Sequence, residues 1–568
     1  MNTVTLTIDG ISVTVPSDYT ILEAAKEASI NIPTLCYLKD LNKIGACRLC
    51  LVEVAGARGL LASCITQVAD GMVVKTNTAA LRKARKLNLE LLLSNHNREC
   101  TTCVRSQNCE LQALCRELGV DEYAFDGSKN EHTVDELSPS IVRDNSKCIN
   151  CRRCIAACNN MQKIGAIGAT RRGFSTSIGC VFDRSLADSP CINCGQCIIA
   201  CPVGALHEKS SINAVWSALN DPEKVVIVQP APAVRASLGE EFGMPMGTAV
   251  TGKLAAALRR LGFDKVFDTD FGADLTILEE GTELLNRLNG GGALPMITSC
   301  SPGWVKYCET FFPEFIPNLS TCKSPHEMLG AIIKTYYAEK NDIDPRNIFT
   351  VSIMPCTAKK YESQRAVLTV RELARMIKTA GIDFARLPDE DFDDMLGDST
   401  GAGVIFGVTG GVMEAALRTV YEVVTGKTLD KVEFTAVRGT EGIKEAEIDL
   451  GARKIRVAVA HGTGNAKKLL GSIKSGEKSY DFIEVMGCPG GCVTGGGQPI
   501  VSAKDLMYCD PKTLRAAALY GEDSGKQLRK SHENPSLKKL YDEFLGEPCG
   551  HKSHELLHTH YEPKKKYR

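Results

Sequence analysis

The sequence predicts a multidomain α/β protein, and three features support this fold class: length, cysteine spacing and hydrophobic pattern. A chain of 568 residues exceeds what one hydrophobic core usually organises, so three or more domains are expected. Most of the 25 cysteines lie before residue 202, in closely spaced groups. After residue 211, short apolar runs typical of buried strands alternate with helical patterns. We therefore expect small cysteine-rich domains followed by one large α/β domain.

The charge and hydropathy of the chain argue against several classes of partner. The formal net charge of −1 predicts neither a nucleic-acid partner nor an anionic membrane partner. The chain has no run of about eighteen apolar residues that could span a membrane. Its first residues lack the basic and apolar regions of a signal peptide. The tight Cys-x-x-Cys spacing therefore favours metal clusters in a reducing cytoplasm over a disulfide scaffold.

Residues 1–80 predict a ubiquitin-like β-grasp domain. Apolar residues alternate on both sides of Asp9-Gly10, which predicts a β-hairpin, and residues 20–28 predict a helix. Four thiolates suit a [2Fe-2S] cluster, and zinc is the alternative for the same four ligands: Cys36, Cys47, Cys50 and Cys64. The region resembles the N-terminal domain of the large iron–sulfur subunit of respiratory complex I.

Residues 81–125 predict a second, smaller cluster domain. Leucines at helical spacing predict a helix over residues 79–94, namely Leu81, Leu87, Leu91 and Leu92. One histidine and three cysteines follow: His96, Cys100, Cys103 and Cys109. Their chemistry alone fits zinc and [4Fe-4S] equally well. The same segment follows the [2Fe-2S] domain in complex I, and this resemblance implies a [4Fe-4S] cluster. Cys115 is predicted to be a spare buried thiol.

Residues 138–210 contain two ferredoxin-like runs of cysteines. In such pairs the fourth cysteine of each run ligates the cluster of the other run. One [4Fe-4S] cluster is therefore expected on Cys148, Cys151, Cys154 and Cys201. A second is expected on Cys191, Cys194, Cys197 and Cys158. Cys180, between the two runs, has no predicted role.

Residues 211–568 have the pattern of a large α/β domain. Strands are predicted at residues 224–228, 349–353, 403–406 and 455–459, and helices at residues 410–424 and 465–472. The stretch from His461 to Asn465 predicts a helix N-terminus. Because the sequence has neither a P-loop nor a complete GxGxxG motif, we expect no NAD or flavin site in this chain.

Three segments of this region carry the chemistry. They are residues 298–304 with Cys300, residues 354–362 with Cys356, and the glycine-rich residues 486–497 with Cys488 and Cys492. Glycines let the backbone approach a bound group closely, and thiolates suit a soft metal centre. In this order the segments resemble the three signature motifs of the [FeFe]-hydrogenase catalytic domain, which holds the H-cluster. The resemblance covers almost the whole chain, because that family also has accessory-cluster domains.

The resemblance implies a set of cofactor-binding residues. Cys356, Cys488 and Cys492 would ligate the [4Fe-4S] cubane of the H-cluster. Cys492 would also bridge to a two-iron unit that carries CO, cyanide and a dithiolate. Lys359 would donate a charge-assisted hydrogen bond to a cyanide. The other positions implied are Glu362 as structural support, Met354 and Met486 as packing neighbours with ordinary core as the alternative, and Pro232 with Ala233. Two positions depart from common family residues: Ala233 replaces a serine and His326 replaces a glutamine.

The first motif departs from the family pattern at a position that matters for ligation. The family usually has two adjacent cysteines before the proline, the first relaying protons and the second ligating the cubane. This sequence has Cys300-Ser301, and a serine hydroxyl gives up its proton far less readily than a thiol. Three assignments of the fourth ligand stay open: Ser301 as an alkoxide, Cys300 as ligand and relay together, or Cys322. We favour Cys300 as the relay.

The remaining proton path is implied by the same resemblance and consists of Glu280, Glu283, Arg287 and Ser320. The first three positions follow at i, i+3 and i+7, so they share one face of a helix. A solvated charged face is the alternative interpretation. Carboxylates spaced by hydrogen-bond steps can pass protons through a serine or water to the thiol of Cys300.

The expected function is that of a hydrogenase, the reversible reduction of protons to H2. Electrons would pass through one [2Fe-2S] and three accessory [4Fe-4S] clusters, to or from ferredoxin or a flavin- and NAD(P)-binding partner subunit. Maturation proteins would insert the H-cluster. The alternative is a non-catalytic homologue, either an iron–sulfur assembly scaffold or a hydrogen sensor; a complex-I-like subunit would leave residues 298–497 unexplained. The C-terminal Cys549, His551, His554, His558 and His560 are a further candidate metal site.

Overall fold

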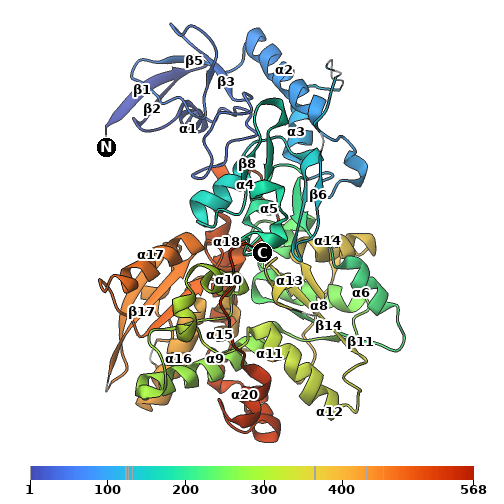
Figure 1. The fold of residues 1–568 in the computed structure, drawn as a ribbon, viewed down its shortest axis with the longest axis vertical. Helices are drawn as coiled ribbons and strands as arrows, with labels where there is room; N and C mark the ends of the chain where they lie inside the picture. The colour runs from blue at the N-terminus through green and yellow to red at the C-terminus, as the bar shows by residue number, and fades with distance from the viewer. Residues whose placement is uncertain are drawn as a thin grey trace.

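The computed structural model describes residues 2–121, 125, 127–130, 132–363, 366–429, 431–451 and 453–567. The cysteine-rich N-terminal part lies at one end of the molecule, and the large α/β part occupies the other end (Figure 1). The mixed α/β, multidomain fold predicted from the sequence is confirmed. Among the helices of the described ranges, none is long and apolar enough to cross a membrane. All 25 cysteines are free thiols.

The N-terminal sheet confirms the predicted hairpin and helix. Five strands lie in the order β2-β1-β5-β3-β4: β1 (Thr3–Ile8), β2 (Ile11–Pro16), β3 (Leu51–Val54), β4 (Leu61–Ala62) and β5 (Val73–Lys75). β1 and β2 pair antiparallel around Asp9-Gly10. Helix α1 (Ile21–Glu27) begins at a capping box, in which the Thr20 side chain accepts from the Glu23 backbone and Glu23 bonds back to the Thr20 backbone.

Helix α2 (Ala79–Asn95) is where the sequence predicts a helix, but its packed face differs from the prediction. Leu81 and Leu89 are buried, whereas Leu87 and Leu91 are 45% and 49% exposed. The buried face follows i, i+4 spacing through Arg85, whose guanidinium donates to the carbonyls of Leu51 and Thr76. The hydrophobic pattern alone did not reveal this arginine as an inward residue. Helix α3 (Glu110–Glu117) follows.

The two ferredoxin-like runs fold as a structural repeat. The three-stranded sheet has the order β10-β7-β6 and contains β6 (Val134–Asp135), β7 (Ile141–Asp144) and β10 (Leu206–Glu208), with the pair β8 (Gly168–Thr170) and β9 (Ser177–Gly179) beside it. Each run enters a short helix, α4 (Arg153–Ala156) or α5 (Gln196–Ala200). Both runs have left-handed backbone at matching positions, Asn150 and Arg152 in the first and Asn193 and Gly195 in the second. These residues turn the backbone so that the cysteines of a run face inward together.

The large part is built on two four-stranded sheets. The first has the order β12-β11-β14-β15, all parallel, with β11 (Val225–Pro230), β12 (Lys265–Val266), β14 (Ile348–Met354) and β15 (Ala366–Thr369). The second has the order β13-β18-β17-β16, with β13 (Met296–Ile297), β16 (Ile443–Asp449), β17 (Lys454–His461) and β18 (Phe482–Met486). Only β16 is antiparallel to its neighbour. In α/β folds of this kind, ligands bind beyond the carboxyl ends of the parallel strands.

The helices around these sheets agree with the predictions except at residues 403–406. There the sequence predicts a strand, but the structure has helix α15 (Gly401–Val404) and a 3₁₀ turn over Ile405–Gly407. A short buried apolar run has the same pattern in a strand and in a buried helix, which explains the error. Gly403 is needed there because a Cβ would lie 2.6 Å from the Asp270 carbonyl oxygen.

The remaining helices of the large part surround the two sheets. They are α6 (Ile212–Leu219), α7 (Pro232–Arg235), α8 (Thr251–Arg260), α9 (Thr269–Asn286), α10 (Pro302–Phe311), α11 (Pro325–Ile332), α12 (Ala338–Lys340), α13 (Lys359–Glu362), α14 (Val370–Thr379), α16 (Gly411–Thr425) and α17 (Thr463–Lys474). The C-terminal segment adds α18 (Pro511–Gly525), α19 (Pro535–Leu540) and α20 (His551–Leu557). α20 packs on α11 (Figure 1). Beyond α20, His558 forms an antiparallel bridge with Cys322.

Candidate active site and iron–sulfur centres

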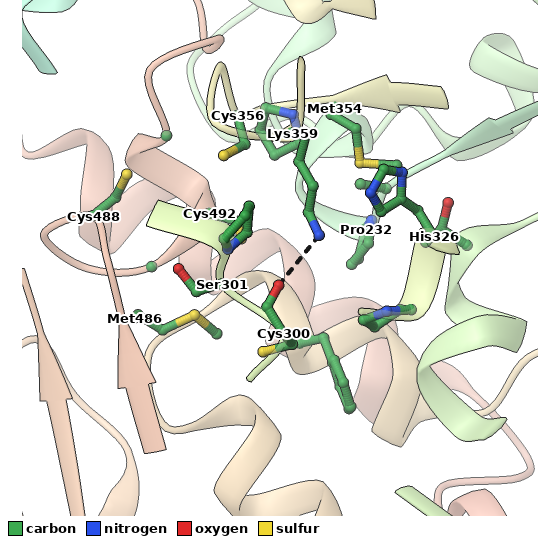
Figure 2. A pocket seen from close by; sticks show the side chains of 18 of the residues that line it. Pro232, Cys300, Ser301, His326, Met354, Cys356, Lys359, Met486, Cys488 and Cys492 are labelled. Atoms are coloured by element: carbon green, nitrogen blue, oxygen red, sulfur yellow. Dashed lines mark hydrogen bonds between the residues drawn. The ribbon is translucent and has the colours of Figure 1, made fainter. Parts of the chain in front are cut away.

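One buried pocket lies where the carboxyl ends of the two sheets meet. Each of the predicted motifs begins just past a strand: Pro232 after β11, Cys300 after β13, Cys356 after β14 and Cys488 after β18. Figure 2 shows these side chains around one cavity. The predicted site residues that line it are Pro232, Cys300, Ser301, His326, Met354, Cys356, Lys359, Met486, Cys488 and Cys492. Ala233 is not among the lining residues; it is buried against Gly407, and Ala231 takes the place beside Pro232.

The glycine-rich loop lies directly against neighbouring backbone. Gly491 has φ +97°, and a Cβ there would lie 2.7 Å from the Thr409 backbone nitrogen. A Cβ on Gly495 would overlap the Pro355 carbonyl oxygen. Gly497 N–H donates to that same oxygen at 2.8 Å. The loops that carry Cys356 and Cys492 are therefore held against each other at a separation that only glycine allows.

The donor set of the pocket fits an iron–sulfur cubane. The thiols of Cys356, Cys488 and Cys492 all face one enclosed, mainly apolar space. Burial raises the pKa of all three thiols. The pKa of Cys488 lies well above the usual range, and that of Cys492 is raised to about 12. Without a metal, these three thiols would stay protonated. Binding of iron would favour their deprotonation, because the thiolate is the metal ligand.

The ammonium of Lys359 is a cationic group at the wall of this space. Burial alone would lower its pKa, but the Glu362 carboxylate raises it, so the group stays charged. Its Nζ donates to Glu362 Oε2 at 2.8 Å and to the Cys300 carbonyl oxygen at 3.2 Å, the latter drawn in Figure 2. The other nearby ring is His326, whose Nε2 lies 2.7 Å from Glu362 Oε2 and whose Nδ1 lies 3.1 Å from Ser352 Oγ. Burial lowers the pKa of His326, which favours the neutral imidazole.

The three candidates for the fourth cubane ligand occupy different places. Ser301 and Cys300 both line the pocket, and Ser301 Oγ accepts a hydrogen bond from Gly487 N–H at 3.1 Å. Gly487 directly precedes Cys488, so Ser301 lies against the cysteine-bearing loop. Cys322 is not among the lining residues; its Sγ lies 3.8 Å from Glu283 Oε2.

The residues predicted for the proton path are polar groups that are buried, except for Glu283, whose side chain is 11% exposed. Glu280 is 1% exposed and Arg287 is 7% exposed, so the interpretation of a solvated charged face is wrong. Burial and, next, the charge of Glu283 raise the pKa of Glu280 to about 8. Ser320 Oγ donates to Glu283 Oε2 at 2.8 Å, and Arg287 Nη2 donates to Glu283 Oε1 at 2.6 Å. Burial and the nearby Glu280 charge both raise the pKa of Cys300.

The predicted ligands of the N-terminal centres are brought together in groups. In the first domain, all four cysteines are buried and Cys50 Sγ lies 3.3 Å from Cys64 Sγ. In the second, one cavity is lined by His96, Cys100, Cys103 and Cys109, and by Cys115 as well. His96 Nδ1 is buried without a hydrogen-bond partner in the described part of the chain, and burial lowers the pKa of the ring to about 4. A neutral imidazole with a free lone pair fits a metal ligand. Cys115 is half-buried and shares the cavity, so the prediction of a spare buried thiol is wrong in its burial.

The ferredoxin-like cysteines group crosswise. One small cavity is lined by Cys148, Cys151, Cys154 and Cys201. Burial raises the pKa of Cys197 well above its usual range, and the nearby Cys194, Cys191 and Cys158 raise it further. This second group adjoins the main pocket: Cys488 Sγ lies 4.0 Å from the Cys194 carbonyl oxygen. Cys180 is buried in the connection between the runs.

Side-chain hydrogen bonds join the second group to the main pocket. Thr357 Oγ1, next to Cys356, donates to the Asn193 carbonyl at 2.7 Å. Gln162 Nε2 donates to the Gly487 carbonyl at 2.8 Å, and Gln196 Nε2 to the Thr494 carbonyl at 2.9 Å. These residues could not be identified from the sequence, because the two glutamine contacts join positions about 300 residues apart and no local motif marks them.

Of the five residues of the predicted C-terminal metal site, Cys549 and His558 lie together, and their ligand atoms and a Glu279 carboxylate oxygen are within 4.8 Å of one another. His551, His554 and His560 are exposed, whereas His558 is buried and bonded to Glu279 and Thr321. Cys549 also bonds to Glu279, through its backbone N–H at 2.7 Å. The sequence signal for this contact is Glu279, which directly precedes the predicted site residue Glu280.

Comparison with known proteins agrees with this arrangement. Five family models match: a 2Fe-2S iron-sulfur cluster binding domain (residues 1–79), the NADH-ubiquinone oxidoreductase-G iron-sulfur binding region (85–123), the ferredoxin-like domain of NADH-quinone oxidoreductase subunit 3 (138–207), the C-terminal domain of the iron only hydrogenase large subunit (224–496) and the iron hydrogenase small subunit (510–564).

Full-length relatives and a solved structure are also similar to this chain, and all are hydrogenases by name. The chain is 52% identical to the NADP-reducing hydrogenase subunit HndD of Solidesulfovibrio fructosivorans, with 99% of each chain covered. It is 46% identical to iron hydrogenase 1 of Clostridium pasteurianum, with 98% of this chain and 99% of that one covered. A structure of the [FeFe]-hydrogenase HydA1 from Chlamydomonas reinhardtii is 46% identical, with TM-score 0.56, and covers 62% of this chain and 99% of that one.

The fold and its sites define a redox metalloenzyme in which iron–sulfur domains lead to one buried, thiol-lined pocket. The chain belongs to the iron-only, or [FeFe], hydrogenase family. It is a hydrogenase with an H-cluster domain, a [2Fe-2S] domain and [4Fe-4S]-binding domains.

Proposed function

We propose that the chain holds one [2Fe-2S] cluster, three accessory [4Fe-4S] clusters and the H-cluster, in four units: residues 1–80, 81–125, 138–210 and 211–568. The first unit is proposed to be a β-grasp domain and the third a two-cluster ferredoxin-like domain. Their ligands are proposed to be the groups of cysteines, with His96, that lie together in each unit. The vacant lone pair of buried His96 supports its place as a ligand.

The H-cluster is proposed to be held by Cys356, Cys488 and Cys492. When bound, it supplies the iron centre at which protons and electrons combine to form H2. The residues around it have their own tasks. Lys359, fixed by Glu362, directs a positive charge into the pocket. Met354 and Met486 line the walls with soft apolar atoms that exclude water.

The fourth cubane position is proposed for Ser301, with Cys300 as the proton relay. Two observations support this division. Ser301 Oγ is fixed against the loop that carries Cys488, whereas Cys300 neighbours Glu280 at the inner end of the polar row. Cys322, beside Glu283, is too far along that row to share the pocket.

Protons are proposed to pass between Cys300 and Glu283 through Glu280 and Ser320. A carboxyl group with a pKa near 8 is both a donor and an acceptor at neutral pH, as a relay requires. Ser320 Oγ donates to Glu283 Oε2, and a hydroxyl can accept one proton while it donates another. The row of polar groups from Cys300 to Glu283 is the single observation that carries the catalytic assignment, because an assembly scaffold has no need of a proton path.

The electron partner is proposed to be a flavin-containing subunit that handles NAD(P), with ferredoxin as the alternative. The relative HndD is named as a subunit of an NADP-reducing hydrogenase and is similar over its full length. No complete dinucleotide motif occurs in this chain, so a partner would have to bind the nucleotide. Purification from the native host tests this proposal: co-elution with a flavoprotein supports it, and a chain that reduces ferredoxin alone contradicts it.

The catalytic proposal is tested with the anaerobically matured protein and one variant. We expect H2 uptake and evolution by the matured protein and none from protein made without H-cluster maturation proteins. Cys300→Ala should retain the infrared bands of CO and cyanide while turnover falls by about 10² to 10⁴, because a methyl group cannot carry a proton. Loss of those bands would move the ligand role from Ser301 to Cys300.

A further inference from the structure

The carboxylate of Glu279, on helix α9, is buried without a lysine or arginine partner. Its side chain is fully buried, and in the described ranges its ion-pair contact is with the imidazole of His558, at 3.1 Å. Glu283, one turn along the same helix, is instead paired with the guanidinium of Arg287 at 2.6 Å. Buried carboxylates in proteins are paired with cations or coordinate metal ions. The charge of Glu279 therefore needs a partner that the cationic side chains do not supply.

Two residues of the C-terminal segment bring further ligand atoms to this carboxylate. The Cys549 sulfur, a ring nitrogen of His558 and a Glu279 carboxylate oxygen all lie within 4.8 Å of one another. Thiolate, imidazole and carboxylate are the three side-chain groups that bind zinc in proteins. At zinc–ligand bond lengths of about 2.0 to 2.3 Å, tetrahedral ligand atoms lie about 3.4 to 3.6 Å apart. The group is therefore close to the spacing that a single zinc ion requires.

The neighbours of these side chains hold them in orientations that suit a metal. Tyr541 donates its hydroxyl to Glu279 Oε1, and the Cys549 N–H donates to Oε2 at 2.7 Å. His558 Nδ1 lies 2.7 Å from Thr321 Oγ1, and Nε2 lies 3.1 Å from Glu279 Oε2. With Nδ1–H donating to the Thr321 hydroxyl, the Nε2 lone pair faces the carboxylate, and a cation between the two would bind both. Metal-binding histidines are oriented in this way, by a hydrogen bond from the ring nitrogen that does not bind the ion.

We propose that Glu279, Cys549 and His558 bind one zinc ion, at a site separate from the clusters of the proposed function. As the zinc–sulfur bond forms, the Cys549 thiol releases one proton, while Nε2 and the carboxylate bind through lone pairs and no electron moves. One dication then faces one thiolate and one carboxylate, so the buried group is neutral. Three protein ligands leave one tetrahedral position for a water molecule.

A second group of side chains shares His558 but suits an ion less well. Glu283 and Cys322 also place ligand atoms within 4.8 Å of that ring. The charge of Glu283, however, is balanced by Arg287, which donates to its Oε1 from two nitrogens, at 2.6 Å and 3.1 Å. A dication at that position would be repelled by the guanidinium. The ion is therefore assigned to Glu279, which has no such neighbour bonded to it in the described ranges.

The site would fasten the C-terminal segment to the large part at both ends of α20. Cys549 lies two residues before this helix, and His558 directly follows it. A helix of seven residues is not stable by itself in water. One ion on Glu279 ties both ends of α20 to α9, the helix that also carries Glu280 of the proposed proton path. We therefore expect the ion to stabilise the C-terminal segment and to take no part in turnover.

An imidazolium–carboxylate pair between His558 and Glu279, without a metal, is the competing explanation. The test uses the anaerobic, matured full-length protein after incubation with a zinc salt and removal of free zinc by gel filtration. We expect about one zinc per chain in wild type and less than about a fifth of that in Cys549→Ser and His558→Gln. Zinc K-edge X-ray absorption of wild type should show one sulfur at about 2.3 Å among nitrogen and oxygen ligands at about 2.0 to 2.2 Å. Zinc in one of the cysteine-rich cluster sites would instead show three or four sulfur ligands.

Cys509→Ser and His551→Gln are the matched controls, because Cys509 is also half-buried and His551 is an exposed histidine of the same segment. Both should keep the zinc. The iron content, the accessory paramagnetic signals and the CO and cyanide bands should be the same in all variants. A chelator should lower the melting temperature of wild type by several degrees and leave that of Cys549→Ser unchanged.

Wild type without stoichiometric zinc, or zinc retained by both Cys549→Ser and His558→Gln, would overturn the inference. If His558→Gln does not fold, the wild-type absorption spectrum and Cys549→Ser decide, and a spectrum without a single sulfur ligand overturns the site. H2 turnover is measured in the same samples. Full turnover in a wild-type protein that binds no zinc refutes this site alone and leaves the proposed function standing.

Discussion

The carboxyl of Glu280, the proposed proton relay, gives a prediction in which turnover falls while stability rises. Glu280 is 1% exposed, and burial with the charge of Glu283 raises its pKa from an ordinary 4.5 to about 8. Glu280→Gln replaces the neutral carboxyl by a neutral amide of the same shape that can neither ionise nor relay a proton.

The size of the stability effect follows from the pKa difference. Below pH 4.5 the carboxyl is protonated in both folded and unfolded chains, so its ionisation costs nothing. As pH rises, the unfolded chain loses this proton first, and the wild-type fold becomes progressively less stable. One pKa unit corresponds to about 1.4 kcal/mol, so the loss is about 3 kcal/mol at pH 7 and about 5 kcal/mol from pH 8 upward. Glu280→Gln avoids this loss.

The assay pairs turnover with thermal unfolding of the matured, anaerobic protein. Relative to wild type, Glu280→Gln should melt several degrees higher at pH 9, with a smaller difference at pH 5.5, while turnover falls by about 10² to 10⁴. Infrared bands of CO and cyanide should remain, which separates a lost relay from a lost cluster. A variant that is no more stable at pH 9 than at pH 5.5, relative to wild type, would refute the reasoning from burial.

Three further predictions concern the ligands and their loops. Cys492→Ala should remove the infrared bands of CO and cyanide but leave the paramagnetic signal of the [2Fe-2S] domain; surviving bands would mean that the bridging ligand is elsewhere. His96→Ala should lower the iron content and remove one [4Fe-4S] signal, and finding zinc in the wild-type site instead would contradict the assignment. Gly491→Ala places a Cβ 2.7 Å from the Thr409 nitrogen, so H-cluster insertion should fail while accessory iron stays; normal activity would count against the packing argument.

The ligand groups could be predicted because their spacing is local. The two runs that start at Cys148 and Cys191 indicate the structural repeat, and the structure adds the left-handed turns at Asn150 and Asn193. The strands at β11, β14 and β17 were predictable for a similar reason, since each is a short buried apolar run between turns. The three motifs of the large domain were identified by their resemblance to the signature motifs of the [FeFe]-hydrogenase family.

The predictions from sequence were wrong or incomplete where contacts between distant segments of the chain determine the local structure. Residues 403–406 form a buried helix because Gly403 fits against Asp270, a contact between segments 133 positions apart. Leu87 is exposed because Arg85 occupies the inward position and bonds to the β3 backbone. His558 reaches Thr321 across 237 positions, and no periodicity in the sequence indicates such a pair.

The proposed electron path and the proposed proton path reach the pocket from different elements of the fold. The ferredoxin-like region proposed to hold the accessory clusters contacts the loops after β14 and β18. Thr357 Oγ1 donates to the Asn193 carbonyl, and the Gly487 carbonyl accepts from Gln162 Nε2. The proton row approaches from β13 and α9, through Cys300 and Glu280. In the proposed assignment, electrons and protons would therefore reach the pocket on different chain segments. A substitution in the proposed proton path should leave the paramagnetic signals of the accessory clusters unchanged. Each path can therefore be disrupted while the other serves as an internal control.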